Sequence, residues 1–204
     1  MNRPVHFSAC VAATLSRWVL TPAIVAIFAL SARAAEPEFK PLFDGKTLDG
    51  WTVTDCQATV EDGGALLLKE GNGMVRTNAK YADFVLEWEC QNVKSEAYDS
   101  GVFVRFDLPY PKGRNWPAKY QVNLKQGEEG NMKDLKAAST GLFKAGEWNH
   151  FRLTVSGSKA ELAINGKEAW KADGIKEKEG YIGLQAETPG GGQYRFRNLK
   201  IAAK

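Results

Sequence analysis

Polar side chains recur at every second position along four otherwise apolar segments of this sequence. Side chains two apart on a β-strand point to the same face, so each segment would present one apolar and one polar face. The polar faces carry Glu87 and Glu89 in "DFVLEWEC", Arg105 and Asp107 in "SGVFVRFD", Gln121 and Asn123 in "KYQVNLK", and Gln185 and Glu187 in "YIGLQAE". If these strands are neighbours in one sheet, carboxylates, amides and one guanidinium share a surface. Such groups suit a sugar, because each sugar hydroxyl both donates and accepts hydrogen bonds.

The same pattern has a second interpretation. One face of an antiparallel sheet is normally polar and wet, and Arg105 could simply pair with Glu89 on a neighbouring strand. Alternation alone leaves both a binding site and an ordinary wet face open.

The apolar faces of the same four segments predict the hydrophobic core. The expected core residues are Phe84, Leu86, Trp88, Val102, Val104, Phe106, Tyr120, Val122, Leu124, Ile182 and Leu184.

Short runs rich in Val, Phe, Leu, Trp and Tyr alternate with polar turns, which is typical of an all-β sandwich or barrel. We expect strands near residues 58–69, 73–77, 83–93, 100–108, 118–125, 148–156, 159–164, 167–171, 180–187 and 193–202. Two turns are well indicated, "EDGG" at 61–64 and Asn165-Gly166, because these residues tolerate positive φ.

Two connections between the expected strands have unusual compositions. Residues 126–140, "QGEEGNMKDLKAAST", are polar and short of apolar anchors, which predicts a surface loop that could act as a lid. Residues 108–120, "LPYPKGRNWPAKY", place aromatic residues among prolines. Trp116 there could form the rim of a sugar site or could pack over the edge of the core.

The first residues resemble a secretory signal. Arg3 and Arg17 precede the apolar run "WVLTPAIVAIFAL". Ala32-Arg33-Ala34 follows the run as an A-x-A cleavage site. The run is too short to span a bilayer as a helix. We therefore expect residues 1–34 to be a signal peptide, cleavage near Ala34, a secreted or periplasmic protein, and no membrane span in the mature chain.

Removal of residues 1–34 changes the charge balance. The segment contains three of the 27 Lys and Arg residues and no Asp or Glu, so 24 basic and 24 acidic residues remain. This neutral balance argues against binding to nucleic acid or anionic lipid. Residues 35–204 suffice for a single domain with a sizeable core.

The mature chain retains two cysteines, Cys56 and Cys90. In an exported protein they could form a disulfide, whereas the period-two position of Cys90 after Trp88 equally fits a buried free thiol. Both possibilities stay open at the level of sequence.

A series of short motifs in fixed order resembles the 3-keto-disaccharide hydrolase family, also described as 3-keto-glucoside 1,2-lyases and 3-keto-2-hydroxyglucal hydratases. The motifs are "FKPLFDGKTLDGW", "VEDGGALL", "YADFVLEWE", "DSGVFVR", "GEWNHFRLTV", "INGKEAW", "GYIGLQAE" and "FRNLKI". The resemblance implies a concanavalin A-like jelly roll of two curved antiparallel sheets, export, and a carbohydrate partner, a glucosyl unit oxidised at C3.

The resemblance also suggests roles for residues. Glu89, in the family's "LEF" strand, or Glu187 would be the base, and Arg105, in the family's "NSGVFLR", would bind the sugar or stabilise the oxyanion. The expected substrate-binding residues are Gln121, Asn123, Asp99, Asp107, Gln185 and Trp116. A divalent metal is a possible cofactor, since family members can require one, although no ligand spacing here demands it.

Three motifs depart from the family pattern. The family's "NSG" is "DSG" here, which puts Asp99 in place of an amide, and "YEVQ" is "YQVN", which puts Gln121 in place of a carboxylate. Where many members have "LQDHG", this chain has "LQAE", with Glu187 in place of histidine. A changed substrate and a non-catalytic carbohydrate-binding module are therefore both compatible with the sequence.

A conventional glycosidase is a further alternative. Glu87 and Glu89 lie two apart on one expected strand, about 6.7 Å between Cα atoms, which is within the range of glycosidase carboxylates. However, the E-x-D-x-x-E strand of jelly-roll glucanases is missing, and adjacent outward glutamates are usually just solvated.

Overall fold

The structure, a computed structural model, describes Met1, residues 37–188 and residues 193–203. Apart from Met1, the expected signal peptide and its cleavage site lie outside the described residues. No helix within the described ranges is long and apolar enough to cross a membrane.

The described chain is built from β-strands, with one 3₁₀ turn at Lys133–Leu135 and no α-helix among these residues. The strands are β1 Lys40–Pro41, β2 Trp51–Val60, β3 Leu66–Thr77, β4 Phe84–Asn92, β5 Ser100–Phe106, β6 Gln121–Asn123, β7 Asn149–Ser156, β8 Lys159–Ile164, β9 Lys167–Asp173, β10 Tyr181–Thr188 and β11 Tyr194–Ala203. The all-β expectation is confirmed.

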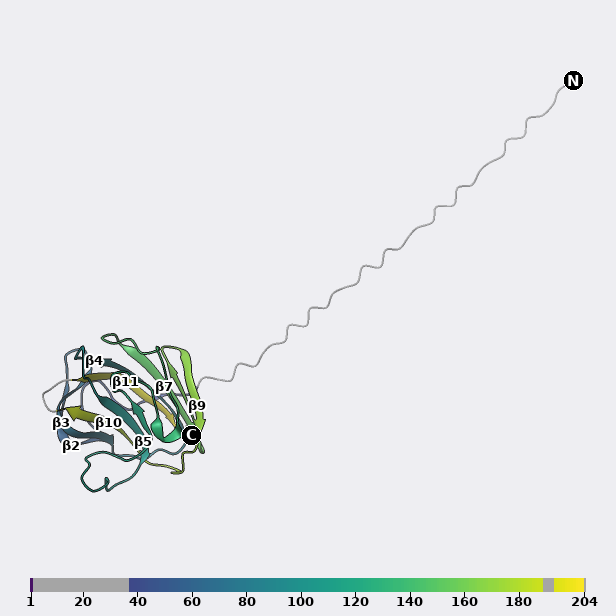
Figure 1. Cartoon of the computed structure of the whole chain (residues 1–204). Helices are drawn as coiled ribbons and strands as arrows, with labels where there is room; N and C mark the ends of the chain where they lie inside the picture. Colours follow the sequence, from purple (N-terminus) through teal and green to yellow (C-terminus); the bar gives the residue numbers. More distant parts are fainter. Residues whose placement is uncertain (2–36, 189–192, 204) are drawn as a thin grey trace. The chain divides into compact units, whose positions relative to one another are not determined.

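The strands form two antiparallel layers that share the long strand β3. The hydrogen-bonded order is β6-β5-β10-β3-β11-β4-β7-β8-β9, with β2 along β3 and β1 on β11. The C-terminal half of β3 pairs with β10, and its first residues pair with β11. We call β6, β5, β10 and the adjoining half of β3 the first layer, and β11, β4, β7, β8 and β9 the second layer (Figure 1).

The passage of β2 and β3 from one layer to the other depends on a glycine. Gly71 has φ +100°, and a Cβ there would lie 2.5 Å from the Asp55 carbonyl oxygen. The pairing register shifts at the same place, between Thr54 and Cys56. A bulge next to a glycine bends the ribbon and lets one pair of strands belong to both layers.

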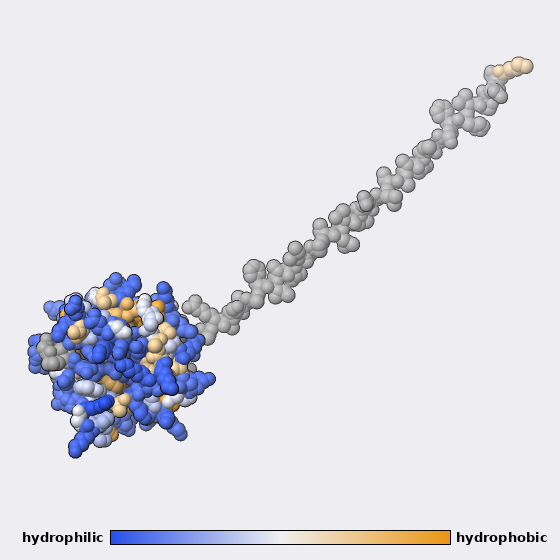
Figure 2. Space-filling view, in the orientation of Figure 1, coloured by the Kyte–Doolittle hydropathy of each residue, from blue (hydrophilic) through white to orange (hydrophobic). Residues whose placement is uncertain are grey.

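Side chains from both layers interdigitate in one main hydrophobic core. Trp88 of β4 stacks on Phe151 of β7 with ring centroids 5.0 Å apart, in the middle of the second layer. All but one of the expected core residues are confirmed, and the exception is Phe106. The face of the domain that Figure 2 shows is mainly hydrophilic, with scattered apolar residues.

Most expected strand boundaries agree with the structure to within two residues, but two regions differ. The strand expected at 118–125 covers only Gln121–Asn123, and the N-terminal hairpin differs as well. A continuous strand at 58–69 is wrong, because the "EDGG" turn at 61–64 separates β2 from β3. That turn is confirmed, and so is the tight turn at Asn165-Gly166, where φ is +52° and +75°.

The expectation that residues 126–140 lack apolar anchors is wrong. Met132 is completely buried, and the Gly130 carbonyl accepts a 2.7 Å hydrogen bond from the Trp170 indole. This segment therefore packs against the second layer. Cys56 and Cys90 are free thiols, Cys90 being buried in the core.

Candidate functional site

A β-bulge changes the direction of Arg105. In the pairing of β10 with β5, two steps on β10 (Tyr181 to Gly183) match three on β5 (Phe106 to Phe103), and Arg105 adopts a positive φ of 48°. One extra residue reverses the alternation beyond it. The expectation that Arg105 shares a face with Phe103 is therefore wrong, and Phe106 joins Phe103 outside the main core.

The Arg105 guanidinium is enclosed by protein. It is 1% exposed and donates hydrogen bonds to the carbonyl oxygens of Ala82, Gly157 and Glu177 at 2.5–2.9 Å. Its fourth partner is the Asp83 carboxylate at 2.6 Å. These contacts connect the end of β5 to turns of the second layer, so the position of Arg105 indicates a structural role and gives its predicted contact with substrate no support.

Glu87 and Glu89 lie on the outer face of the second layer, away from the other candidates, because β4 pairs with β11 and β7. Glu87 is 8% exposed and contacts Arg152, Lys200 and His150. Glu89 accepts hydrogen bonds from Arg197 at 2.6 Å and Asn198 at 3.1 Å.

Burial alone would raise the pKa of both glutamates. In Glu87, hydrogen bonds from Lys200 and His150 and the nearby cationic charges outweigh burial and lower the pKa. In Glu89, hydrogen bonds from Arg197 and Asn198 do the same. Both groups are thus ion-paired carboxylates, which makes a base role for Glu89 poorly supported.

Asp107 lies beyond the end of β5, whereas Trp116 lies on the same outer face as the glutamines. The residues that it packs against, Phe103 and Met74, are the cross-strand partners of Gln121 and Gln185. Asp107 is exposed and pairs with Lys80 at 2.8 Å. Trp116 is half-buried and packs with Phe103 and Met74 in a small apolar cluster on the outer face of the first layer. The Asn115 side chain, which donates to the Asn72 carbonyl at 2.8 Å, fixes this segment over β3.

Five predicted residues do come together on the outer face of the first layer, and we call them the amide–carboxylate site. They are Asp99, Gln121, Asn123, Gln185 and Glu187. The Gln121 amide donates to Gln185 Oε1 at 2.6 Å, and the Gln185 amide donates to Glu187 Oε2 at 2.8 Å. Strands β6, β5 and β10 position this chain of amides.

Gly101 makes the meeting of the two glutamines possible. It lies on β5 between Asn123 of β6 and Gln185 of β10, and a Cβ at this position would be 2.2 Å from Gln121 Nε2. Any side chain would therefore displace the amide. The glycine of the "DSGVFVR" motif therefore leaves room for the Gln121 amide beside Gln185.

Asp99 and Glu187 form a pair of carboxyl groups with raised pKa values. Burial, and then the charge of Glu187, raise the pKa of Asp99 to about 6. Burial also raises the pKa of Glu187, against the opposing charge of Lys125 and the hydrogen bond from Gln185. A carboxyl group whose pKa lies near 6 can take up and release a proton close to neutral pH.

Three residues of this region were not candidates from sequence. The charge of Lys125 acts on both carboxyls, Gln193 accepts a 2.6 Å hydrogen bond from the Asp99 backbone N–H, and Glu128 accepts one of 2.7 Å from the Asn123 amide. Alternation from "KYQVNLK" already puts Lys125 on the polar face. Glu128 and Gln193 lie in connections, where no periodic pattern applies.

Asp99, Gln185, Glu187 and Gln193 line a narrow crevice that has no interior space for a water molecule. Sites that enclose whole small molecules usually measure about 300–1,000 Å³. A sugar bound here would therefore lie over the surface of the neighbouring strands.

The groups at this site can perform proton transfer. An ionised carboxylate beside a protonated one can act as base and acid, and the amides can bind hydroxyl or carbonyl oxygens. A divalent cation needs several oxygen ligands around one point. Across residues 37–188 and 193–203 no three His, Cys, Asp or Glu side chains gather in that way. The divalent metal that the resemblance allows therefore stays a prediction.

Comparison with known proteins identifies relatives of this chain. The family described as "3-keto-alpha-glucoside-1,2-lyase-like domain" matches residues 38–202. Two putative glycosyl hydrolase structures from Parabacteroides distasonis share the fold. One has 22% identity and a TM-score of 0.61, covering 82% of this chain and 100% of the other. The other has 18% identity and a TM-score of 0.60, and the match covers 81% of this chain and 94% of the other.

A binding module shares the fold as well. Carbohydrate binding module CBM66 from Bacillus subtilis is 15% identical with a TM-score of 0.57, and the match covers 76% of this chain and 96% of that module. No curated protein sequence matches this chain.

Proposed function

The chain belongs to the 3-keto-α-glucoside-1,2-lyase-like family, and on this premise we propose that it cleaves 3-keto-glucosides at the amide–carboxylate site by elimination followed by hydration. The family supports a carbohydrate-active, glycosyl hydrolase-like function. The finer assignment of substrate and reaction depends on the chemistry of the site.

A ketone at C3 makes the C2 proton of the sugar acidic. A base removes this proton and leaves an enolate with its negative charge on the C3 oxygen. When the carbonyl re-forms, the electron pair makes the C1=C2 double bond, the bond from C1 to the glycosidic oxygen breaks, and that oxygen takes a proton. Water then adds its hydroxyl to C1 and a proton to C2, which gives net hydrolysis.

The amide–carboxylate site has a group for each of these steps. Glu187 is the base in its ionised form, and Asp99, whose pKa is raised to about 6, donates the proton to the leaving oxygen. The amides of Gln121 and Asn123 bind hydroxyls, and Gln121 or Lys125 stabilises the enolate oxygen. Arg105 and Glu89 have no part in this scheme, because they form ion pairs with Asp83 and Arg197.

The observation that carries the proposal is the grouping of two partly buried carboxyls beside the bonded amides of Gln121 and Gln185 on one layer. The pKa of Asp99 is raised in part by the charge of Glu187, while the glutamates of the second layer have lowered pKa values. Proton transfer near neutral pH requires a carboxyl group whose pKa is raised, as that of Asp99 is.

A second candidate is a carbohydrate-binding module that does not catalyse. The likeness of fold to CBM66 favours it, and so does the replacement of a carboxylate by Gln121 in "YQVN". A binding module would retain a 3-keto-glucoside intact, whereas an enzyme would consume it.

The deciding experiment incubates the purified protein with methyl 3-keto-α-D-glucopyranoside and follows the ketone and released methanol by NMR. The proposal predicts turnover in the wild type, with and without EDTA, and none in Glu187→Gln. Binding without loss of the ketone would support the binding module instead.

We also propose that the protein is exported after cleavage near Ala34, on the strength of the apolar run and A-x-A site alone. N-terminal sequencing of protein from the periplasm or medium should give Ala35 as the first residue. An intact Met1 in the exported fraction would contradict this.

A further inference from the structure

An open groove of about 790 Å³ lies on the outer face of the second layer, which does not carry the amide–carboxylate site. Its lining includes Glu61, Asp62, Gln91, Trp148, Arg195 and Arg197, and we call it the arginine–tryptophan groove. Sites for small molecules usually measure about 300–1,000 Å³. The groove is therefore large enough for a ligand, and none of these residues belongs to the proposed reaction.

Two inner strands of the second layer form the floor of the groove. Arg195 of β11 lies directly across from Gln91 of β4, and Arg197 lies across from Glu89. Both strands have a strand neighbour on each side, β3 and β4 for β11, and β11 and β7 for β4. An extended peptide binds by adding to a free sheet edge, which this floor does not offer. A ligand in the groove must therefore bind to side chains.

Hydrogen bonds hold both walls of the groove in place. On one side, the Glu61 carboxylate of the 61–64 turn accepts bonds from Arg195 Nε at 2.6 Å and Nη2 at 3.1 Å. On the other side, the Gly146 carbonyl accepts from the Gln91 amide and the Gly146 N–H donates to Asn92, each at 2.7 Å. A ligand would not have to order these segments, which lowers the cost of binding.

Trp148 supplies aromatic surface at the second wall. The Arg197 guanidinium carbon lies 3.9 Å from the centroid of the Trp148 rings, and Arg197 Nε donates to Glu89 at 2.6 Å. These contacts fix the indole and the guanidinium against each other. Trp148 is half-buried and lines the groove, so part of its ring system is available to a ligand. Such a surface suits the C–H groups of a sugar ring.

The two arginines keep hydrogen-bond donors for a ligand. In the described part of the chain, Nη1 of Arg195 and both Nη atoms of Arg197 donate to no protein group. The Gln91 side chain donates through its nitrogen, which leaves its oxygen as an acceptor, and the exposed Asp62 carboxylate is a second acceptor. Donors and acceptors thus line one space, and sugar hydroxyls bind to both kinds of group.

The charges of the groove favour a neutral ligand. Two carboxylates, Glu61 and Asp62, and two guanidinium groups, Arg195 and Arg197, line it, so their formal charges cancel. Glu89, which is bonded to Arg197, adds a further negative charge beside the floor. An anionic ligand would therefore gain little electrostatic attraction, whereas a neutral polyhydroxyl ligand can use every group.

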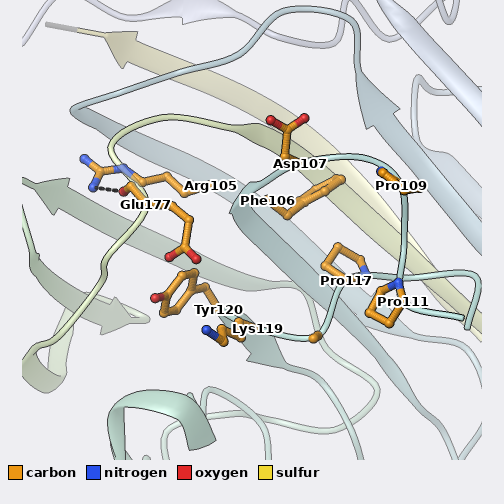
Figure 3. A pocket seen from close by; sticks show the side chains of 10 residues that line it. Arg105, Phe106, Asp107, Pro109, Pro111, Pro117, Lys119, Tyr120 and Glu177 are labelled. Atoms are coloured by element: carbon orange, nitrogen blue, oxygen red, sulfur yellow. Dashed lines mark hydrogen bonds between the residues drawn. The ribbon is translucent and has the colours of Figure 1, made fainter.

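The hollow of about 260 Å³ at the end of β5 differs from the groove (Figure 3). The Arg105 guanidinium there points away from the space and donates to the Glu177 carbonyl at 2.9 Å. Although burial raises the pKa of Glu177, the hydrogen bond from the Tyr120 hydroxyl to its carboxylate lowers it. Arg105 and Glu177 are thus engaged by protein groups, whereas the guanidinium groups of the groove keep three nitrogens for a ligand.

We propose that the arginine–tryptophan groove is a second, non-catalytic site that binds a neutral oligosaccharide. Its hydroxyls bond to the guanidinium nitrogens, the Gln91 oxygen and Asp62, while one sugar ring packs against Trp148. In a carbohydrate-active protein, such a site holds a glycan while the first layer acts on another unit. The proposal does not depend on the reaction proposed above.

The test is an NMR titration of the ¹⁵N-labelled protein with maltotriose and with cellotriose. These neutral triglucosides differ in linkage, carry no ketone and cannot undergo the proposed elimination. With at least one of them we expect saturable amide shifts at residues 61–63, 91 and 195–197. The indole N–H signal that is missing from the spectrum of Trp148→Phe should shift as well.

Variants at Trp148 measure the contribution of the aromatic ring. Trp148→Ala should raise Kd about tenfold, because the apolar contact with the sugar is lost, and Trp148→Phe should raise it less than about threefold. Thr154→Ala, on the same face of β7 but outside the groove, should bind like the wild type. Glu187→Gln should also bind like the wild type, so a failed reaction and a failed groove give different results.

Three outcomes would overturn the proposal. They are the absence of saturable shifts at these residues with both triglucosides, equal Kd values for Trp148→Ala and the wild type, and shifts with trigalacturonic acid but with neither neutral sugar. If Trp148→Ala fails to fold, Asp62→Asn at the exposed turn replaces it. This variant should raise Kd about threefold, since a charged acceptor is lost, and an unchanged Kd would count equally against the proposal.

Discussion

The outer faces of the two layers carry carboxylates of the same kind in opposite electrostatic surroundings. On the second layer, Glu87 contacts Arg152, Lys200 and the His150 imidazole, and Glu89 pairs with Arg197. The pKa of each glutamate is lowered. On the first layer, Asp99 and Glu187 line one crevice beside the Gln185 amide, and the pKa of each is raised.

The difference separates charges that stabilise the fold from charges that can react. A carboxylate bonded to cations keeps its charge and is a poor proton carrier at neutral pH, whereas one beside another carboxylate gains and loses a proton there. Position on a polar strand face is therefore insufficient evidence for a catalytic role. The hydrogen-bonding and charged partners of each carboxyl group decide whether it can transfer a proton at neutral pH.

The largest expected effect concerns activity. Glu187→Gln should lower kcat/KM for a 3-keto-glucoside by about 10²–10⁴-fold, because it removes the base from the amide–carboxylate site. Glu89→Gln is the matched control on the second layer and should change kcat/KM less than about threefold. Steady-state kinetics measures both values. A larger loss of kcat/KM in Glu89→Gln than in Glu187→Gln would put the reactive carboxylate on the second layer.

Arg105 sharpens the comparison, because it is a charged residue at the end of β5 that the fold binds on all sides. Arg105→Ala should lower the free energy of unfolding by about 3–5 kcal/mol, since Asp83 loses its partner and three carbonyls lose their donor. Urea denaturation measures this change. A fully stable variant that has lost all turnover would instead return Arg105 to the active site.

Glu87→Gln tests the stabilising role of the second layer. At pH 7 it should cost about 2 kcal/mol, because hydrogen bonds to an almost buried charge are lost. The pKa of Glu87 is lowered on folding, so its contribution exists above its unfolded value of 4.5 and is lost as pH falls through the folded value. Urea denaturation at pH 7 and pH 3 should show the difference shrink, and a constant difference would argue against charge.

Asp99→Asn should raise the free energy of unfolding at high pH, whereas Glu87→Gln lowers it, and its effect should be the smallest of the four. A folded pKa of about 6 against 3.8 in the unfolded chain means that Asp99 favours folding below pH 3.8 and opposes it above about pH 6. For a half-exposed side chain we expect Asp99→Asn to stabilise the protein by about 1 kcal/mol at pH 8 and not at pH 3.5. Destabilisation at pH 8 would show that Asp99 is ionised without strain.

Much of the fold is predictable from alternation. The strand at Lys159–Ile164 and the turns at 61–64 and 165–166 follow directly from local composition. Local pattern assigns residues to faces, but it does not say which strands are neighbours. For this reason Glu89 was placed with Gln121, although β4 pairs with strands about 60 and 110 residues later in the chain.

The bulge at Arg105 limits prediction in another way. One additional residue reverses the faces beyond it, and nothing in "VFVRF" marks the position, since arginine seldom adopts a positive φ. The resemblance of motifs was more informative. It drew attention to the motifs that carry Asp99, Gln121, Asn123, Gln185 and Glu187, which occupy neighbouring strands of the first layer, but it also grouped Glu89 and Arg105 with them.

The most direct test of the central claim is the fate of the hydrogen at C2. We would follow the cleavage of methyl 3-keto-α-D-glucopyranoside in D₂O by ¹H NMR, correcting for exchange without enzyme. Elimination at Glu187 followed by hydration predicts one solvent deuterium at C2 of the product for the wild type and Glu89→Gln, and no reaction for Glu187→Gln. Cleavage with the C2 hydrogen retained, as in direct displacement at C1, would contradict the account.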